Sequence, residues 1–260
     1  MRGLGDYRRG VCFQLLVTFD AARDPARPET LFTIAAVIAA MGTMGVKDRR
    51  AVSELIVRLR EDGYVTTERA AHDRRVVELR ATDKAREADR EWIEVLHRPM
   101  TILAPDEARF RPGAQRDPTY QWAYRATALA TLPHAGAVMA GHPEADYFVR
   151  QTQGARIMMT LMQAVRGRPD LRTDPGFYSW AAERCGVSAQ HIRKVMAGAE
   201  TRGWIAVSGG KGAIIEVSPA LDAGVRRWSA ACFSLIDLNN RHAWALLSEA
   251  GPEAASVAGF

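Results

Sequence analysis

Two groups of side chains at helical spacing carry the chemistry needed to contact nucleic acid. They comprise Lys47, Arg50, Ser53 and Val57 in the first group, and Ser188, Gln190, His191, Arg193 and Lys194 in the second. Arginine can donate two hydrogen bonds to guanine, glutamine can pair with adenine, and a small apolar group fits the thymine methyl. Lysine and serine suit phosphate oxygens. Both groups therefore have the composition of a surface that contacts double-stranded DNA.

Each group is expected on the exposed face of a helix. Apolar residues at 52, 55, 56 and 59 recur at 192, 195, 196 and 199, a constant shift of 140 positions. This spacing is that of a single buried stripe on a helix. At about 100° per residue, the opposite face of the first helix also includes Glu54, and that of the second includes Ala197. Asp48 and Ser188 occupy equivalent positions and predict the helix N-caps.

The repeat continues after both helices. Gly63-Tyr64-Val65 and Gly203-Trp204-Ile205 each place a glycine, an aromatic and a β-branched residue after the helix, which predicts a C-cap leading directly into a strand. Strands are expected at 64–67 and 76–80 in the first copy, and at 204–207 and 213–217 in the second. The hairpin tips contain the further candidate DNA contacts His72, Arg74, Arg75 and Lys211.

Two more helices are predicted before each of these. They cover about 10–19 and 29–40 in the first copy, with Pro28 at the start of the second helix, and about 154–165 and 174–185 in the second copy. Asp174-Pro175 is interpreted as an N-cap followed by the first helical residue. After the first hairpin, a charged helix over 82–97 is expected to begin with Thr82 as its cap.

The order helix, helix, helix, β-hairpin is that of a winged helix-turn-helix domain. The sequence thus predicts a mainly α fold with small β-hairpin wings (α+β), with tandem winged helix-turn-helix domains joined by a helical connector. The expected segments are a first domain at 7–97, a connector at 98–150, a second domain at 151–240 and a C-terminal tail at 241–260. Because the connector holds six prolines, we expect it to be largely irregular, with a short helix near 120–124 and a longer one from Pro143.

The first hairpin resembles the wing of the MarR family of bacterial transcription regulators. That family's wing follows the pattern Asp-x-Arg-x-x-x-Leu-x-Leu-Thr, and Asp73, Arg75, Leu79 and Thr82 match it, whereas Ala81 replaces the second leucine. The resemblance covers about residues 10–95, and the second copy is a generic winged helix. It implies DNA binding through the third helix and the wing. It also implies that Asp73 and Arg75 form an internal pair that holds the hairpin, leaving Arg74 for phosphate.

Composition and charge agree with a folded protein that has an anionic partner. The chain has 260 residues, 47% hydrophobic content and a net charge of +5, which excludes a disordered chain. Residues 150–230 contain twelve Lys and Arg against six Asp and Glu, whereas residues 1–100 contain eighteen against sixteen. The second domain is therefore expected to supply more of the nonspecific affinity for DNA.

Other chemistry is not indicated by the sequence. The six histidines are scattered and no metal-ligand spacing occurs, so we expect no metal, no cofactor and no enzyme activity. Gly209-Gly210-Lys211-Gly212 lacks the full phosphate-loop pattern. The apolar run 11–19 is interpreted as a core helix, and 30–46 is too short to span a membrane. Three distant cysteines favour a reducing cytoplasm, and Cys12 is expected to be a buried, inert thiol.

We therefore expect a cytoplasmic, sequence-specific DNA-binding regulator, whose single chain would span two half-sites about one helical turn apart. Two alternatives stay open: a replication initiator that binds iterated sites, and a tandem winged-helix module that docks on proteins. A small-molecule effector and a homodimer are also left open as partners. Aromatic residues of the connector would either line an effector pocket or belong to the core; these are Tyr120, Trp122, Tyr124, Tyr147 and Phe148.

Overall fold

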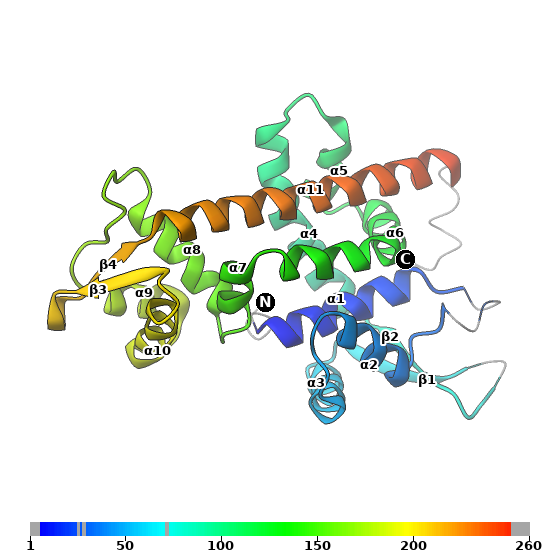
Figure 1. The fold of residues 1–260 in the computed structure, drawn as a ribbon. Coiled ribbons are helices and arrows are strands. Elements are labelled where there is room, and N and C mark those ends of the chain that lie inside the picture. The colour runs from blue at the N-terminus through cyan, green and yellow to red at the C-terminus, as the bar shows by residue number, and fades with distance from the viewer. Residues whose placement is uncertain (1–5, 25–26, 28–29, 71–72, 251–260) are drawn as a thin grey trace. The chain divides into compact units, whose positions relative to one another are not determined.

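The computed structural model describes residues 6–24, 27, 30–70 and 73–250, which form mainly helices and two antiparallel hairpins (Figure 1). Contacts divide them into two compact units. Unit 1 contains the described residues between 8 and 136 and between 232 and 250. Unit 2 contains residues 137–231 together with 6 and 7. The mainly helical class with two small hairpins agrees with the sequence prediction.

Both units contain three helices followed by a hairpin and a further helix. In the first, these elements are α1 (Tyr7–Ala21), α2 (Ile34–Thr43), α3 (Arg49–Glu61), β1 (Val65–Arg69), β2 (Val77–Ala81) and α4 (Asp83–Leu103). In the second they are α8 (Gly154–Val165), α9 (Phe177–Cys185), α10 (Ala189–Glu200), β3 (Ile205–Ser208), β4 (Ile214–Val217) and the first part of α11 (Pro219–Ala250), whose residues from 232 onward belong to unit 1. A short helix, α7 (Pro143–Val149), precedes α8.

The step from helix to strand has the same backbone geometry in both copies. The amide of Tyr64 donates to the carbonyl of Leu59 at 2.9 Å, and that of Trp204 donates to the carbonyl of Ala199 at 3.1 Å. Gly63 and Gly203 have φ of 75° and 70°, a left-handed conformation that glycine adopts without strain. This is a Schellman-type helix end, and it directs the chain immediately into the strand. The prediction from the glycine-aromatic-β-branched motif is confirmed at both sites.

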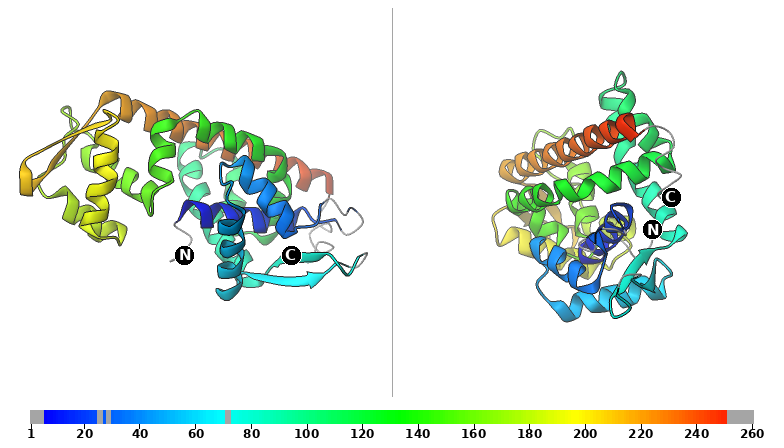
Figure 2. Two further views of the ribbon diagram at one scale, coloured as in Figure 1. Left: turned by 60° about the horizontal axis from the view of Figure 1, so that its bottom comes forward. Right: turned by 90° about the vertical axis from the view of Figure 1, so that its right-hand side faces the viewer.

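A third segment pairs briefly with the second strand of each hairpin, which the sequence analysis did not predict. β1 pairs with β2 from Val65 opposite Ala81 to Arg69 opposite Val77, and β3 pairs with β4. Isolated antiparallel bridges join Thr33 to Glu78 and Arg172 to Glu216. In both units, therefore, the segment before the second helix lies along the returning strand. The β1–β2 hairpin extends away from α3 as a narrow arm (Figures 1 and 2).

The core beneath the first hairpin combines apolar side chains with the buried carboxylate of Asp20. Phe13 packs edge-on against Tyr64 with ring centroids 5.4 Å apart. The side chain of Asp20 is fully buried and accepts hydrogen bonds from Arg80 at 2.8 Å and Arg86 at 2.9 Å. Cys12 is also buried, and burial raises the pKa of its thiol to about 12. The expectation of a buried thiol is confirmed, and the high pKa keeps it protonated.

The prediction of an irregular connector is wrong. α4 continues to Leu103, and after η2 (Ala108–Phe110) and α5 (Arg111–Ala114) a long helix, α6, runs over Pro118–Ala140. Its aromatic residues Tyr120 and Tyr124 are buried beside Ile93 of α4 and Ala243 of α11. Tertiary burial of these side chains stabilises helices that contain Pro99 and Pro133. Phe148 is fully buried in the core of unit 2.

Several predicted helix boundaries are also corrected. The second helix begins at Ile34 because the hydroxyl of Thr33 accepts from the amide of Ala36 at 3.2 Å; Pro28 and Glu29 lie outside the described residues. α9 begins at Phe177, since the carboxylate of Asp174 binds Arg168 instead of capping the helix. The helix from Pro143 ends at Val149 rather than running into α8. The expected C-terminal tail is helical over 241–250, where it completes α11.

Across the residues described above, none of the helices is both long enough and apolar enough to cross a membrane.

Candidate nucleic-acid interface

The face of α10 opposite its buried stripe presents the predicted polar group to solvent. Ile192, Val195, Met196 and Ala199 are buried, whereas Ser188, Gln190, Arg193, Lys194 and Ala197 are exposed. The hydroxyl of Ser188 accepts from the amide of His191 at 3.1 Å, which confirms the predicted N-cap. The exposed side chains border a shallow hollow along the helix. α10 thus places an amide and two cations on one accessible surface.

Arg193 is supported by a neighbouring aromatic ring. Its guanidinium lies over the ring of Tyr178 in α9, 5.4 Å from the centroid. A cation above an aromatic face is attracted by the ring quadrupole, and the contact limits the rotamers of the arginine. The residue as a whole is exposed, so a partner can reach it from solvent. Sequence reasoning did not identify Tyr178 as part of this surface, since it comes from another helix.

His191 differs from its predicted companions. It is half-buried, and its Nε2–H donates to the backbone carbonyl of Thr152 at 2.9 Å. This hydrogen bond holds the start of α10 against the turn that precedes α8. The imidazole is therefore already engaged within unit 2, and we assign it a positioning role.

The equivalent face of α3 is exposed in the same way. Lys47, Arg50, Ser53 and Val57 are accessible, with 42% of Val57 exposed, whereas Val52, Ile56 and Leu59 are buried. The carboxylate of Asp48 accepts from the amides of Arg50 at 3.0 Å and Ala51 at 3.2 Å, so the predicted N-cap is confirmed. A shallow hollow lies here too, bordered by Arg50, Ser53, Glu54, Val57, Arg58 and Glu61. Arg58 was not predicted.

The two faces differ in charge. Arg50 Nε donates to Glu54 Oε1 at 3.1 Å, so a carboxylate on the same helix partly offsets this cation, although the pair is exposed and therefore weak. At the positions equivalent to Arg50, Ser53 and Glu54, α10 has Gln190, Arg193 and Lys194. The hollow on α10 is bordered by two cations and no carboxylate. Of the two hollows, the one on α10 has the more positive border, because Glu54 and Glu61 offset Arg50 and Arg58 at the hollow on α3.

The first hairpin tip presents two exposed arginines, Arg74 and Arg75. The carboxylate of Asp73 accepts from the backbone amide of Arg75 at 2.8 Å, and Arg69 donates to the carbonyl of Arg74 at 2.8 Å. Asp73 thus stabilises the turn through the main chain of Arg75, whereas the expected pairing was with its side chain. His72 lies outside the described residues. At the second tip Lys211 belongs to η3 (Gly210–Gly212), and its side chain is not described.

No cluster of three or more His, Cys, Asp or Glu side chains suited to a metal ion occurs in the described ranges.

No family model and no curated protein sequence matches this chain.

Proposed function

We propose that this chain is a sequence-specific, double-stranded DNA-binding transcription regulator built from two winged helix-turn-helix domains. The observation that carries the proposal is the repeated placement of α3 and α10. Each begins at a side-chain cap, packs its apolar stripe inward (with Leu55 half-buried where Val195 is buried), exposes the opposite face and ends in a glycine step into a hairpin. In a winged helix the third helix enters the major groove while the wing contacts the flanking backbone.

In this proposal α10 supplies most of the affinity. Arg193 and Lys194 would neutralise phosphates or donate to guanine, and Gln190 would pair with adenine. α3 contributes less, because Glu54 competes with DNA for Arg50. Arg74 and Arg75 would contact the backbone beside the groove, since the main-chain hydrogen bonds of the turn leave their exposed side chains at its surface.

The test measures retention of genomic DNA fragments by the purified full chain at about 50 and 200 mM salt, followed by sequencing. We expect a small number of discrete sites to persist at the higher salt. Sites beside promoters support the regulator, whereas iterated sites at an origin would replace it with a replication initiator. Uniform retention that disappears with salt would mean electrostatic attraction without sequence recognition, and would overturn the proposal.

A matched pair of variants locates the interface. Arg193→Glu/Lys194→Glu reverses two charges on α10, and Arg156→Glu/Arg227→Glu reverses two exposed charges elsewhere in unit 2. We expect specific binding to be lost in the first variant and kept in the second. An equal loss in both would indicate dependence on net charge alone.

A second function is favoured for the α3 face by one observation. Its central arginine is partly offset by Glu54 and the face also exposes Val57, a composition that suits a protein partner better than DNA. If the chain with the reversed α10 charges keeps its cellular function without affinity for DNA, the protein-interaction module is the correct interpretation.

A further inference from the structure

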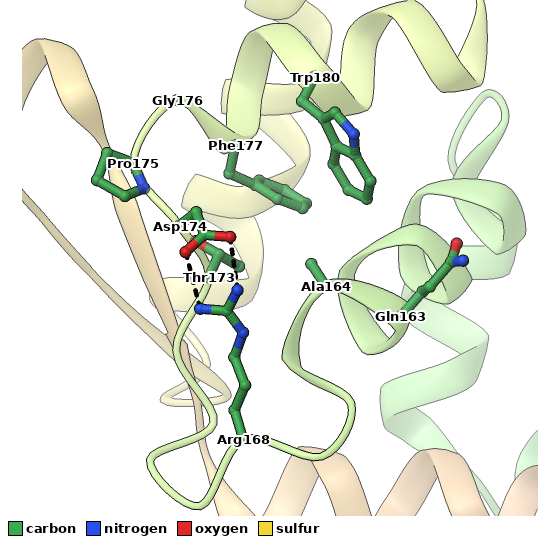
Figure 3. A pocket seen from close by; sticks show the side chains of 9 residues that line it. All are labelled: Gln163, Ala164, Arg168, Thr173, Asp174, Pro175, Gly176, Phe177 and Trp180. Atoms are coloured by element: carbon green, nitrogen blue, oxygen red, sulfur yellow. Dashed lines mark hydrogen bonds and ion pairs between the residues drawn. The ribbon is translucent and has the colours of Figure 1, made fainter.

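Unit 2 contains a pocket of about 430 Å³ that the DNA-binding proposal does not use (Figure 3). It lies between the C-terminal end of α8, the loop that follows and the start of α9. Its lining residues are Gln163, Ala164, Arg168, Thr173, Asp174, Pro175, Gly176, Phe177 and Trp180. This volume is within the range of small-molecule sites.

One side of the pocket is apolar and aromatic. Phe177 and Trp180 project from α9 on the same side, with ring centroids 6.0 Å apart, and Ala164 of α8 lies opposite them (Figure 3). Phe177 is buried, whereas Trp180 is 39% exposed although it is a large aromatic residue. A half-exposed indole beside a cavity gains stability when a flat apolar group covers it. These walls therefore favour a ring.

The other side carries charge. Arg168 points into the pocket and donates two hydrogen bonds to the carboxylate of Asp174, from Nη1 at 2.9 Å and from Nη2 at 2.5 Å (Figure 3). The arginine side chain is 38% exposed and that of Asp174 is 76% exposed. The ion pair lowers the pKa of the Asp174 carboxyl. Because exposed pairs of this kind contribute little stability, another carboxylate can replace Asp174 at modest cost.

A second guanidinium stands beside the aromatic wall. Arg184 lies over the Trp180 ring, 5.0 Å from its centroid, and donates to the amide oxygen of Gln163 at 3.2 Å. Both of these partners are neutral. In addition, Gly176 lines the pocket at the start of α9, where no side chain caps the helix. The helix dipole gives this N-terminal end a partial positive charge. Arg168, Arg184 and the helix end attract an anion, whereas Asp174 and Asp170, whose charges both act on Arg168, oppose it. An anion therefore binds only where its own carboxylate replaces Asp174 on Arg168.

From these walls and charges we propose that the pocket binds a small aromatic carboxylate. The ring lies among Phe177, Trp180 and Ala164. The carboxylate accepts from the Arg168 guanidinium in place of Asp174, in the planar two-point geometry that arginine offers to carboxylates. This inference concerns ligand binding alone and does not depend on DNA recognition.

The proposal is tested with three probes that each contain a benzene ring but differ in charge: the anion benzoate, the neutral benzamide and the cation benzylamine. Each is titrated into the full chain at low salt, and binding is followed by NMR through the indole N–H signal of Trp180. The chain has six tryptophans, so this signal is assigned by its loss in Trp180→Phe. We expect benzoate to shift the signal saturably, with the other two binding at least tenfold more weakly. Equal binding of all three, or no binding of benzoate, would overturn the proposal.

Variants then locate the carboxylate. Arg168→Gln is expected to weaken the binding of benzoate at least tenfold. Arg166 is an exposed arginine outside the lining residues, and Arg166→Gln should leave the affinity for benzoate unchanged. Asp174→Asn should strengthen benzoate binding several-fold, because it removes the internal competitor. If Arg168→Gln unfolds the loop, the tighter binding expected in Asp174→Asn can still be measured. Weaker binding in Asp174→Asn, or equal binding in the two arginine variants, would contradict the assignment.

Discussion

Arg50 donates to the carboxylate of Glu54 at 3.1 Å, one helical turn further along α3. At the equivalent positions, α10 has Gln190 and Lys194. The two helices share a buried stripe and an N-cap geometry, yet only one of them partly offsets its own central cation. The two exposed faces thus have equivalent positions on their helices but differ in charge, and the Arg50–Glu54 pair is one of the differences.

Replacing Glu54 by lysine makes the α3 face resemble that of α10. The change frees Arg50 and adds a cation, so we expect tighter binding to nonspecific DNA. The slope of log affinity against log salt concentration should also become steeper, by the equivalent of about one to two additional phosphate contacts. Fluorescence anisotropy over a salt series measures both quantities. Glu249→Lys, at an exposed position of α11, is the control for net charge. If the two variants behave alike, α3 does not contact DNA.

The buried pair of Asp89 and Arg125 connects α4 to α6 in unit 1. Arg125 Nε donates to Asp89 Oδ2 at 3.0 Å, and both residues are at least 94% buried. Asp89→Asn leaves a buried guanidinium without its counter-ion, and we expect the free energy of unfolding to fall by about 3–5 kcal/mol. Urea denaturation measures the change. The double variant Asp89→Leu/Arg125→Met should be more stable than either single variant, and the opposite order would refute a coupled pair.

Gly113 lies against two aromatic rings of the unit 1 core. A β-carbon at this position would be 2.6 Å from His97 Cδ2 and 2.9 Å from Tyr120 Cε1. Gly113→Ala is therefore expected to destabilise the protein by about 1–3 kcal/mol through overpacking. At Gly42 of α2, no atom lies within 4 Å of the place that a β-carbon would occupy, so Gly42→Ala should be neutral or stabilising by up to about 1 kcal/mol. Thermal unfolding distinguishes the two outcomes.

His97 is expected to make stability depend on pH. Its Nδ1–H donates to the carbonyl of Ile93 at 2.7 Å, and Nε2 lies 3.0 Å from Tyr120 Oη. Burial lowers the pKa of the imidazole below its ordinary value of 6.5, although the hydrogen bonds with Ile93 and Asn240 oppose this shift; the nearby charge of Arg125 lowers it further. As pH falls through 6.5, the unfolded chain therefore binds a proton that the folded chain does not, and stability decreases.

The measurement compares free energies of unfolding at about pH 7.5 and 5.5. The free energy of unfolding is expected to fall between these two pH values. We expect this decrease to be smaller by about 1 kcal/mol in His97→Gln than in the unchanged chain. His134→Gln, at an exposed histidine, should leave that loss as it is. An unchanged acid loss in His97→Gln would show that this imidazole is not the group responsible.

The features that could be predicted from the sequence depend on interactions within a few residues. The caps by Asp48 and Ser188 and the turns at Gly63 and Gly203 follow from local backbone chemistry. The exposed faces of α3 and α10 follow from the 3.6-residue period. These local signals were sufficient to locate both candidate recognition helices and both hairpins.

The tertiary structure decided the features that depend on partners far apart in the chain. His97 meets Asn240 across 143 positions, and Asp20 meets Arg86 across 66. The helical connector is stabilised by such contacts, which is why its prolines gave a misleading prediction. His191 likewise forms a hydrogen bond with the carbonyl of Thr152, a partner that the helical spacing did not reveal. A polar side chain satisfied by a distant partner has no periodic signature, because its environment exists only once the core has formed.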